Sequence, residues 1–118
     1  MSRTYIASAI PIIFATLMPV IAVAGVSVAD LRSYCTSAVE WKSTYCAGYI
    51  AGALDTYEIA NRVIKVPLFC PDHALDYPEM MAIVRKWFAD HPDEANMNAG
   101  SVVLEAMSYK FPCEQKKN

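Results

Sequence analysis

The sequence lacks the charge pattern of a nucleic-acid-binding protein. Its 118 residues carry a net charge of −2 at pH 7, and its lysines and arginines form no basic cluster. Proteins that bind nucleic acid need such a cluster to neutralise phosphates. The two lysines near the C-terminus, Lys116 and Lys117, are interpreted most simply as part of a solvated tail. We therefore do not expect nucleic acid as a partner.

The sequence also lacks the motifs of common enzyme and metal sites. It contains no nucleophile elbow, no H-E-x-x-H and no C-x-x-C, which argues against hydrolase, zinc-protease and thioredoxin-like chemistry. Its two histidines, His73 and His91, lie in separate predicted loops, so a zinc site is not expected. A Cys–His nucleophile pair is the alternative, and oxidation of the thiols would remove it. We expect a protein that is not an enzyme and binds neither a metal nor a cofactor.

The N-terminal segment predicts export. Arg3 precedes a long apolar run, and small residues at Ala22 and Ala24 fit an A-x-A cleavage site. We predict a signal peptide over residues 1–24, cleaved after Ala24, and a mature exported domain over residues 25–118. A retained membrane anchor is the alternative, because about 20 apolar residues span a bilayer. The mature part has the length of one domain.

The cysteines predict two disulfides. An even number of cysteines in a small exported domain is typical of a disulfide framework. The four are Cys35, Cys46, Cys70 and Cys113. Three pairings are open, and we favour Cys46–Cys70 with Cys35–Cys113. The first would tie the start of a long helix to the loop that follows it, and the second would tie the two ends of the domain together. Each would stabilise the fold by about 3–4 kcal/mol through its effect on the unfolded chain.

Hydrophobic periodicity predicts an all-α fold. No segment of the mature part alternates in the manner of a strand, and apolar residues recur at helical spacing. Ser27 and Asp76 are predicted N-caps. The expected helices cover residues 26–35, 40–64, 79–91 and 99–111. The sequence therefore predicts a small four-helix domain stapled by two disulfides.

The longest predicted helix contains two glycines one turn apart, Gly48 and Gly52. Each costs about 1 kcal/mol relative to alanine in a helix interior, so we expect them to serve a structural purpose. They share one side of the helix with Tyr49 and Asp55. We interpret this side as a packing motif, on which the third or fourth helix, or the same helix of a second subunit, approaches closely. A ligand-binding role and a catalytic use of Asp55 are the alternatives.

The order of motifs resembles the Rap/Tai family, which are immunity proteins for amidase effectors of the type VI secretion system. The motifs are "LRSYC", "CAGYIAGALD", "FCPD", "HPDE" and "FPC", and they extend from Leu31 to Cys113. The resemblance implies a small, mostly helical periplasmic protein. It also implies a homodimer, because characterised members are dimers. Those members bind a peptidoglycan-cleaving Cys–His amidase and cover its active site, so the resemblance implies such an effector as the partner.

Inhibition by occlusion needs a short polar loop on a fixed base. The first candidate is the turn between the last two predicted helices, with His91, Pro92, Asp93, Glu94 and Asn96. The second is the group Pro71, Asp72, His73 and Tyr77 in the long loop. An ordinary helix connection is the alternative for both.

The alternative function is a non-immunity role of the same periplasmic fold, as a small chaperone or an envelope-stress binding protein. The six methionines and seven tyrosines suit a surface that binds partners loosely.

Overall fold

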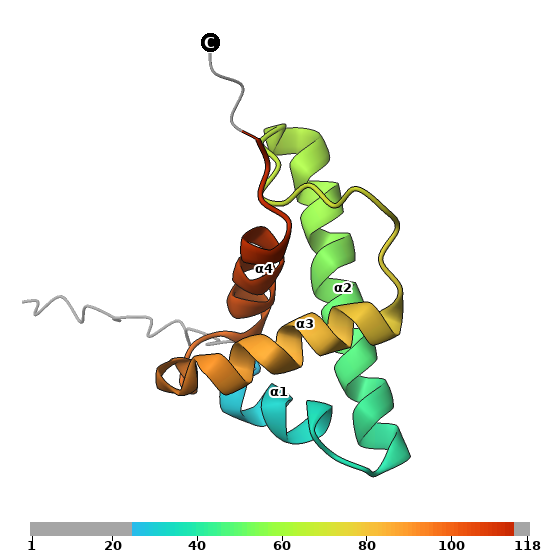
Figure 1. Ribbon diagram of the computed structural model, residues 1–118, viewed down its shortest axis with the longest axis vertical. Helices are drawn as coiled ribbons and strands as arrows, with labels where there is room; N and C mark the ends of the chain where they lie inside the picture. The colour runs from blue at the N-terminus through green and yellow to red at the C-terminus, as the bar shows by residue number, and fades with distance from the viewer. Residues whose placement is uncertain (1–24, 115–118) are drawn as a thin grey trace, which may run out of the picture.

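The computed structural model describes residues 25–114 and shows four α-helices (Figure 1). They are α1 (Val28–Cys35), α2 (Glu40–Ile64), α3 (Tyr77–Asp90) and α4 (Ala99–Lys110), with a short 3₁₀ helix η1 (Pro92–Glu94) before α4. Within the described residues there is no strand, and Ser27 and Asn98 form an isolated bridge. The prediction of an all-α, four-helix domain is confirmed. The predicted signal peptide lies outside the described residues.

The helix ends follow ordinary capping chemistry, and the predicted N-caps Ser27 and Asp76 are confirmed, whereas the Asn98 cap was not predicted. The side chains of Ser27, Asp76 and Asn98 each accept a hydrogen bond from the backbone N–H three residues later. Helix α3 begins at Tyr77, two residues before the predicted start, because Asp76 is its cap. Helix α2 ends at Ile64, and its C-cap residue Lys65 adopts a left-handed conformation with φ 58°. None of the described helices is long and apolar enough to cross a membrane.

The core lies where α3 crosses α1 and α2 and where α4 packs against α2 and α3 (Figure 1). Helix α2 contributes only Cys46 and Ile50 as fully buried residues, and both lie in its first half. Its second half extends away from this core. The other large, fully buried side chains are Leu31, Cys35, Val84, Phe88, Val102, Val103 and Met107.

The four cysteines form two disulfides, but the favoured pairing was wrong. Cys35 is bonded to Cys46, with Cα atoms 5.0 Å apart, and Cys70 is bonded to Cys113, with Cα atoms 4.9 Å apart. The short turn after α1 returns the chain directly onto the first half of α2, so Cys35 meets Cys46. The loop after α2 runs back only to Tyr57, whose hydroxyl accepts a hydrogen bond from Leu68 N.

Tyr57 is about 16 Å along α2 from Cys46, so the loop does not bring Cys70 near Cys46. The loop instead crosses the chain end after α4, where Cys70 N donates to the carbonyl of Phe111 at 2.8 Å. The second disulfide therefore fixes the long loop to the C-terminal segment.

Candidate partner-binding surfaces

The turn between α3 and α4 has a rigid side-chain base. The ring of His91 stacks on Trp87 with centroids 3.9 Å apart and an interplanar angle of 17°. His91 Nδ1 lies 2.9 Å from the Trp87 carbonyl oxygen, and Trp87 Nε1 donates to the Glu94 carboxylate at 2.9 Å. These three side chains therefore hold the end of α3 and the following 3₁₀ turn as one unit.

Backbone hydrogen bonds fix the same turn to the N-terminal segment. Val28 N donates to the Met97 carbonyl at 3.0 Å, and Ala29 N donates to the Ala95 carbonyl at 2.9 Å. The N–H at the start of α4 donates back to the Val26 carbonyl at 2.8 Å. The turn is thus held at both ends, as an occluding loop on a fixed base requires.

The two acidic residues of this turn, Asp93 and Glu94, lie in different environments. Glu94 is half-buried and accepts the indole hydrogen bond, so its carboxylate is already used within the fold. Asp93 is exposed, and no hydrogen bond or ion pair involves its carboxylate within residues 25–114. Pro92 and Asn96 are exposed beside it. Among the predicted residues of the turn, Asp93 is the one whose charge is available to a partner.

An aromatic pocket of about 510 Å³ lies beside this turn, between α3 and α4. Trp87, His91 and Tyr109 line it, and the Tyr109 ring packs against Trp87 with ring centroids 5.4 Å apart. Lys110 lies at the rim, and Tyr109 is 78 % exposed. The prediction named His91 but neither Trp87 nor Tyr109. The spacing of Trp87 and His91, four residues apart on one helix side, was the signal that could have identified the stack.

The second predicted site, Asp72 and His73, forms a different cluster. His73 Nδ1 lies 2.6 Å from the Asp72 carboxylate, and His73 Nε2 lies 2.9 Å from the Glu79 carboxylate. The hydrogen bonds from Asp72 and then Glu79 raise the pKa of His73. Because both ring nitrogens face carboxylates, only the protonated ring can donate to both. This cluster joins the long loop to the start of α3 and leaves the His73 ring little freedom to contact a partner.

The two predicted sites do not come together. One precedes α3 and the other follows it, so the length of this helix, about 20 Å, separates them (Figure 1). A single small groove on an effector cannot engage both, and the turn after α3 is the better candidate for insertion.

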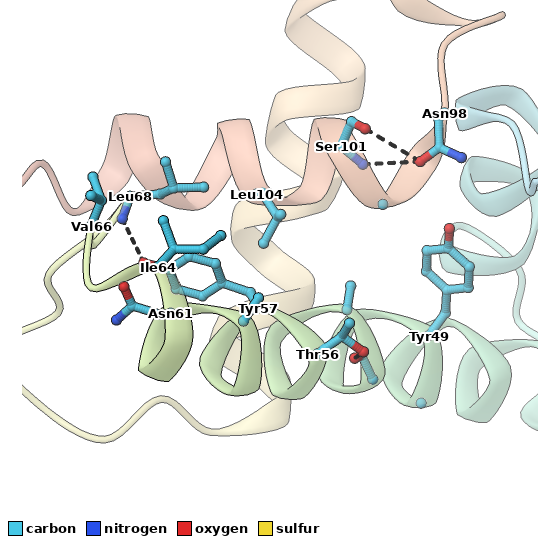
Figure 2. Close-up of a pocket in the computed structure, with 15 residues that line it drawn as sticks. Tyr49, Thr56, Tyr57, Asn61, Ile64, Val66, Leu68, Asn98, Ser101 and Leu104 are labelled. Carbon is cyan, nitrogen blue, oxygen red and sulfur yellow. Dashed lines mark hydrogen bonds between the residues drawn. The ribbon is translucent and has the colours of Figure 1, made fainter.

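A third surface was not predicted from the sequence. A groove of about 970 Å³ runs between α2 and α4. Figure 2 shows Leu104 of α4 and Tyr49 of α2 directed toward the space between the two helices. Burial raises the pKa of the Tyr49 hydroxyl, and a hydrogen bond with the Gly100 backbone acts in the opposite direction. At the far end the groove is lined by Ile64, Val66 and Leu68, which are 50–66 % exposed.

The two glycines do not pack against a helix of the same chain. A Cβ atom built on Gly48 or Gly52 meets nothing within 4 Å, and both residues are exposed. The prediction that α3 or α4 approaches this side was wrong, because α2 turns the opposite side, with Cys46 and Ile50, toward the core. Asp55 is also exposed. The remaining interpretation, contact with a second subunit, is not tested by one chain.

The described residues contain neither a free thiol nor a cluster of metal ligands. All four cysteines are in disulfides, so there is no thiol for nucleophilic catalysis. Among residues 25–114, no cluster of histidine, cysteine or acidic side chains could hold a metal ion. The available features are an uncommitted carboxylate, an aromatic pocket and an apolar groove.

Comparison with known proteins identifies the family. Neither the curated proteins nor the solved structures contain a match to this chain. A family model described as Rap1a immunity proteins matches residues 27–113, which include all four helices and both disulfides. The chain therefore belongs to the Rap1a immunity protein family.

Proposed function

We propose that this protein is a periplasmic immunity protein that binds and occludes a peptidoglycan amidase effector of a type VI secretion system, and so protects the cell that makes it. Membership of the Rap1a immunity family supports the immunity role. The resemblance of its motifs to the Rap/Tai proteins supports the amidase as the class of effector. The absence of a thiol nucleophile and a metal cluster among the described residues agrees with inhibition by binding alone.

The observation that carries this proposal is the exposed, uncommitted Asp93 on a turn fixed at both ends. In a Cys–His amidase the reactive thiolate is paired with a cationic histidine. A carboxylate inserted beside that imidazolium would form a charge-assisted hydrogen bond, and the turn behind it would block substrate. Because the Trp87–His91–Glu94 base already orders the turn, little conformational entropy remains to be lost on binding.

The aromatic pocket beside the turn supplies the second part of the contact. Trp87 and Tyr109 are residue types that dominate binding energy at protein interfaces when partly exposed side chains become buried. We expect an apolar side chain from the rim of the amidase groove to enter the pocket and contact both rings. Lys110 at the pocket rim favours an acidic residue next to that side chain.

Two features support the proposed periplasmic location. Disulfides persist in oxidising compartments. One disulfide here joins α1 to α2, and the other joins the long loop to the segment after α4. The N-terminal apolar run with its A-x-A site is the expected export signal, cleaved after Ala24. A periplasmic location places the protein where a peptidoglycan amidase acts.

The test is inhibition of peptidoglycan amidases of the Cys–His class, beginning with any that is encoded beside the gene of this protein. The exported protein is purified from the periplasm, and release of amide-linked peptide from isolated peptidoglycan is measured with increasing inhibitor. We expect tight inhibition by the native protein. Asp93→Ala should weaken it by about tenfold or more, since truncating one partner of an interfacial charge pair removes its electrostatic complement.

The matched control is Glu105→Ala, which removes an exposed carboxylate on α4 and should leave inhibition unchanged. Equal inhibition by Asp93→Ala and the native protein would remove the turn from the mechanism. No binding to any amidase by the native protein would contradict the proposed function itself.

A second candidate function is supported by the exposed apolar residues around the end of α2. Ile59, Val63 and Ile64 are 66–80 % exposed, which is unusual for a protein without a partner. A small chaperone or envelope-stress protein would use such a surface for unfolded clients. Suppression of aggregation of a denatured periplasmic protein, without inhibition of any amidase, would favour this role.

A further inference from the structure

The groove between α2 and α4 has a floor of small residues. Four of its lining residues lie four positions apart along one side of α2, namely Gly48, Gly52, Thr56 and Ala60. A Cβ atom built on Gly48 or Gly52 meets nothing within 4 Å, so the space above the floor is open. The Thr56 hydroxyl donates to the Gly52 carbonyl at 2.8 Å, which leaves mainly apolar atoms on this surface. Glycine is unfavourable inside a helix, and here it keeps the groove unfilled.

Contacts between α2 and its neighbours limit the groove at both ends. At one end the Tyr49 hydroxyl of α2 is hydrogen-bonded to the Gly100 backbone at the start of α4. At the other end the Tyr57 hydroxyl accepts from Leu68 N, which holds the loop after α2 against the helix (Figure 2). The second disulfide fastens the same loop to the segment after α4. A groove limited in this way suits a molecule of finite length, whereas a helix of a partner protein would have to continue past its ends.

The loop end of the groove contains a polar atom without a hydrogen-bond partner. Asn61 lines the groove, and its side-chain oxygen Oδ1 is buried and accepts no hydrogen bond from the residues that the structure describes. Figure 2 shows this oxygen on the side of the loop. A buried acceptor without a donor is unfavourable, so a ligand that brings a hydroxyl group to it gains affinity. Ile64 and Val66 beside it are 66 % and 60 % exposed, so their side chains can rotate and admit that group.

The charge next to the loop end is positive. Among the described residues, no charged side chain lines the groove itself. Lys65 lies between the lining residues Ile64 and Val66, is exposed, and forms no ion pair within residues 25–114. Glu58, one turn and a half earlier on α2, is already paired with Arg62 at 2.9 Å. The Lys65 ammonium is therefore available to a negatively charged group held at this end.

We propose that the groove binds a single-chain anionic lipid, with the acyl chain along the small residues of α2 and a hydroxyl-bearing head group between Asn61 and Lys65. One acyl chain spans half of the hydrocarbon core of a bilayer, about 15 Å. From Tyr49 to Ile64 the groove extends about 22 Å along α2, which leaves room for the chain and the start of its head group. Its volume of about 970 Å³ is at the upper end of the range of about 300–1,000 Å³ for small-molecule sites.

The first experiment measures binding of a defined probe. The protein is exported as the full chain and purified without detergent, and lauroyl lysophosphatidylglycerol is titrated by calorimetry below its micelle-forming concentration. We expect saturable binding of one lipid per chain. Shortening the acyl chain should weaken binding by about twofold to fourfold for each methylene removed, because each buried methylene contributes to affinity. The absence of saturable binding, or an affinity independent of chain length, would overturn the proposal.

The second experiment locates the lipid. Gly52→Leu should weaken binding by more than about tenfold, because the leucine side chain would occupy the floor of the groove. It should leave the circular dichroism spectrum unchanged, since nothing lies within 4 Å of a Cβ at this position. The matched control is Ala89→Leu, which adds a leucine at an exposed site on α3 and should bind the probe normally. Equal affinities of Gly52→Leu and the native protein would place the lipid elsewhere and contradict the proposal.

The third experiment tests the position of the head group with two probes of equal chain length. Lys65→Asn removes the charge and keeps a residue type that tolerates the left-handed conformation. It should weaken binding of the anionic probe by about twofold to fivefold and leave that of neutral monolauroylglycerol unchanged. Lys42→Asn, which removes a cation near the other end of α2, is the matched control and should change neither affinity. An equal effect of the two lysine variants would separate Lys65 from the head group and refute its placement.

Asn61→Leu should weaken binding of both probes, because both carry hydroxyl groups, and should raise the melting temperature of the lipid-free protein, because it removes an unpaired acceptor. Unchanged affinity for both probes would contradict a hydrogen bond to Asn61.

The lipid site does not depend on the proposed function, because Asp93 does not line the groove. Gly52→Leu should therefore inhibit the amidase as well as the native protein does. Two results would assign the groove to another occupant and overturn the proposal. Gly52→Leu could lose amidase inhibition, which would make the groove an effector surface. Sedimentation equilibrium could show that lipid binds only after a dimer dissociates, which would mean that a second copy of the chain covers the groove.

Discussion

The two disulfides should differ in both their contribution to stability and their accessibility. The Cys35–Cys46 bridge has a sequence separation of 11 residues, and the Cys70–Cys113 bridge has a separation of 43. The chain-entropy relation then gives about 3 kcal/mol for the shorter loop and about 4 kcal/mol for the longer one. Cys35 and Cys46 are completely buried, whereas Cys70 is exposed.

The perturbation is stepwise reduction of the native protein, followed by alkylation and mass spectrometry. A mild reductant should open Cys70–Cys113 first, because one of its sulfur-bearing residues is exposed. Cys35–Cys46 should resist until denaturant is added. The double variant Cys70→Ser with Cys113→Ser should lose about 4 kcal/mol of unfolding free energy in urea titrations followed by circular dichroism.

Three results would refute this reasoning. Peptide mapping of the unreduced protein could find Cys46 linked to Cys70. Reduction could open Cys35–Cys46 first under native conditions. The double serine variant could unfold at the same urea concentration as the native protein. Any of them would mean that the long loop is not fastened to the C-terminal segment as described.

Two further predictions concern the ends of α3. Glu94→Ala removes the acceptor of the Trp87 indole hydrogen bond, so it should lower the unfolding free energy by about 1 kcal/mol and red-shift tryptophan fluorescence. The control Asp93→Ala should change neither quantity. An unchanged fluorescence spectrum in Glu94→Ala would show that this hydrogen bond does not order the turn. Because Asp72 and Glu79 raise the pKa of His73 above its unfolded value, the stability from this cluster is fully present below the unfolded pKa and is lost as the pH rises through the folded one. The melting temperature should therefore fall as the pH rises from 6 toward 9. His73→Gln should flatten this pH dependence, whereas His91→Gln should not. If the melting temperature fell equally with pH in both variants, the dependence would belong to other groups.

Local chemistry allowed the helices to be predicted well. The cap at Asp76 and the apolar spacing after it marked α3, and the uninterrupted run before Lys65 marked α2. These signals depend only on residues within one or two turns of each other. The fold class and the helix order were therefore accessible from the sequence.

The disulfide pairing and the surroundings of the glycines were not accessible in the same way. Both depend on which side of α2 faces the core, and that is decided by contacts between segments far apart in the sequence. Gly48 and Gly52 had the right spacing for close packing, but the spacing does not say whether the neighbour belongs to the same chain. The hydrogen bond between Glu94 and the Trp87 indole was also not predicted, because it depends on where the indole lies after the turn has folded.

The arrangement of the two bridges has a consequence for biogenesis. In the proposed export to the periplasm, the N-terminal bridge can be oxidised as soon as the first half of α2 has crossed the membrane. The other must wait until the segment after α4 arrives, and until then Cys70 remains a reactive thiol. A partly translocated chain would thus carry a free thiol at Cys70, which disulfide-forming enzymes and quality-control proteases could recognise.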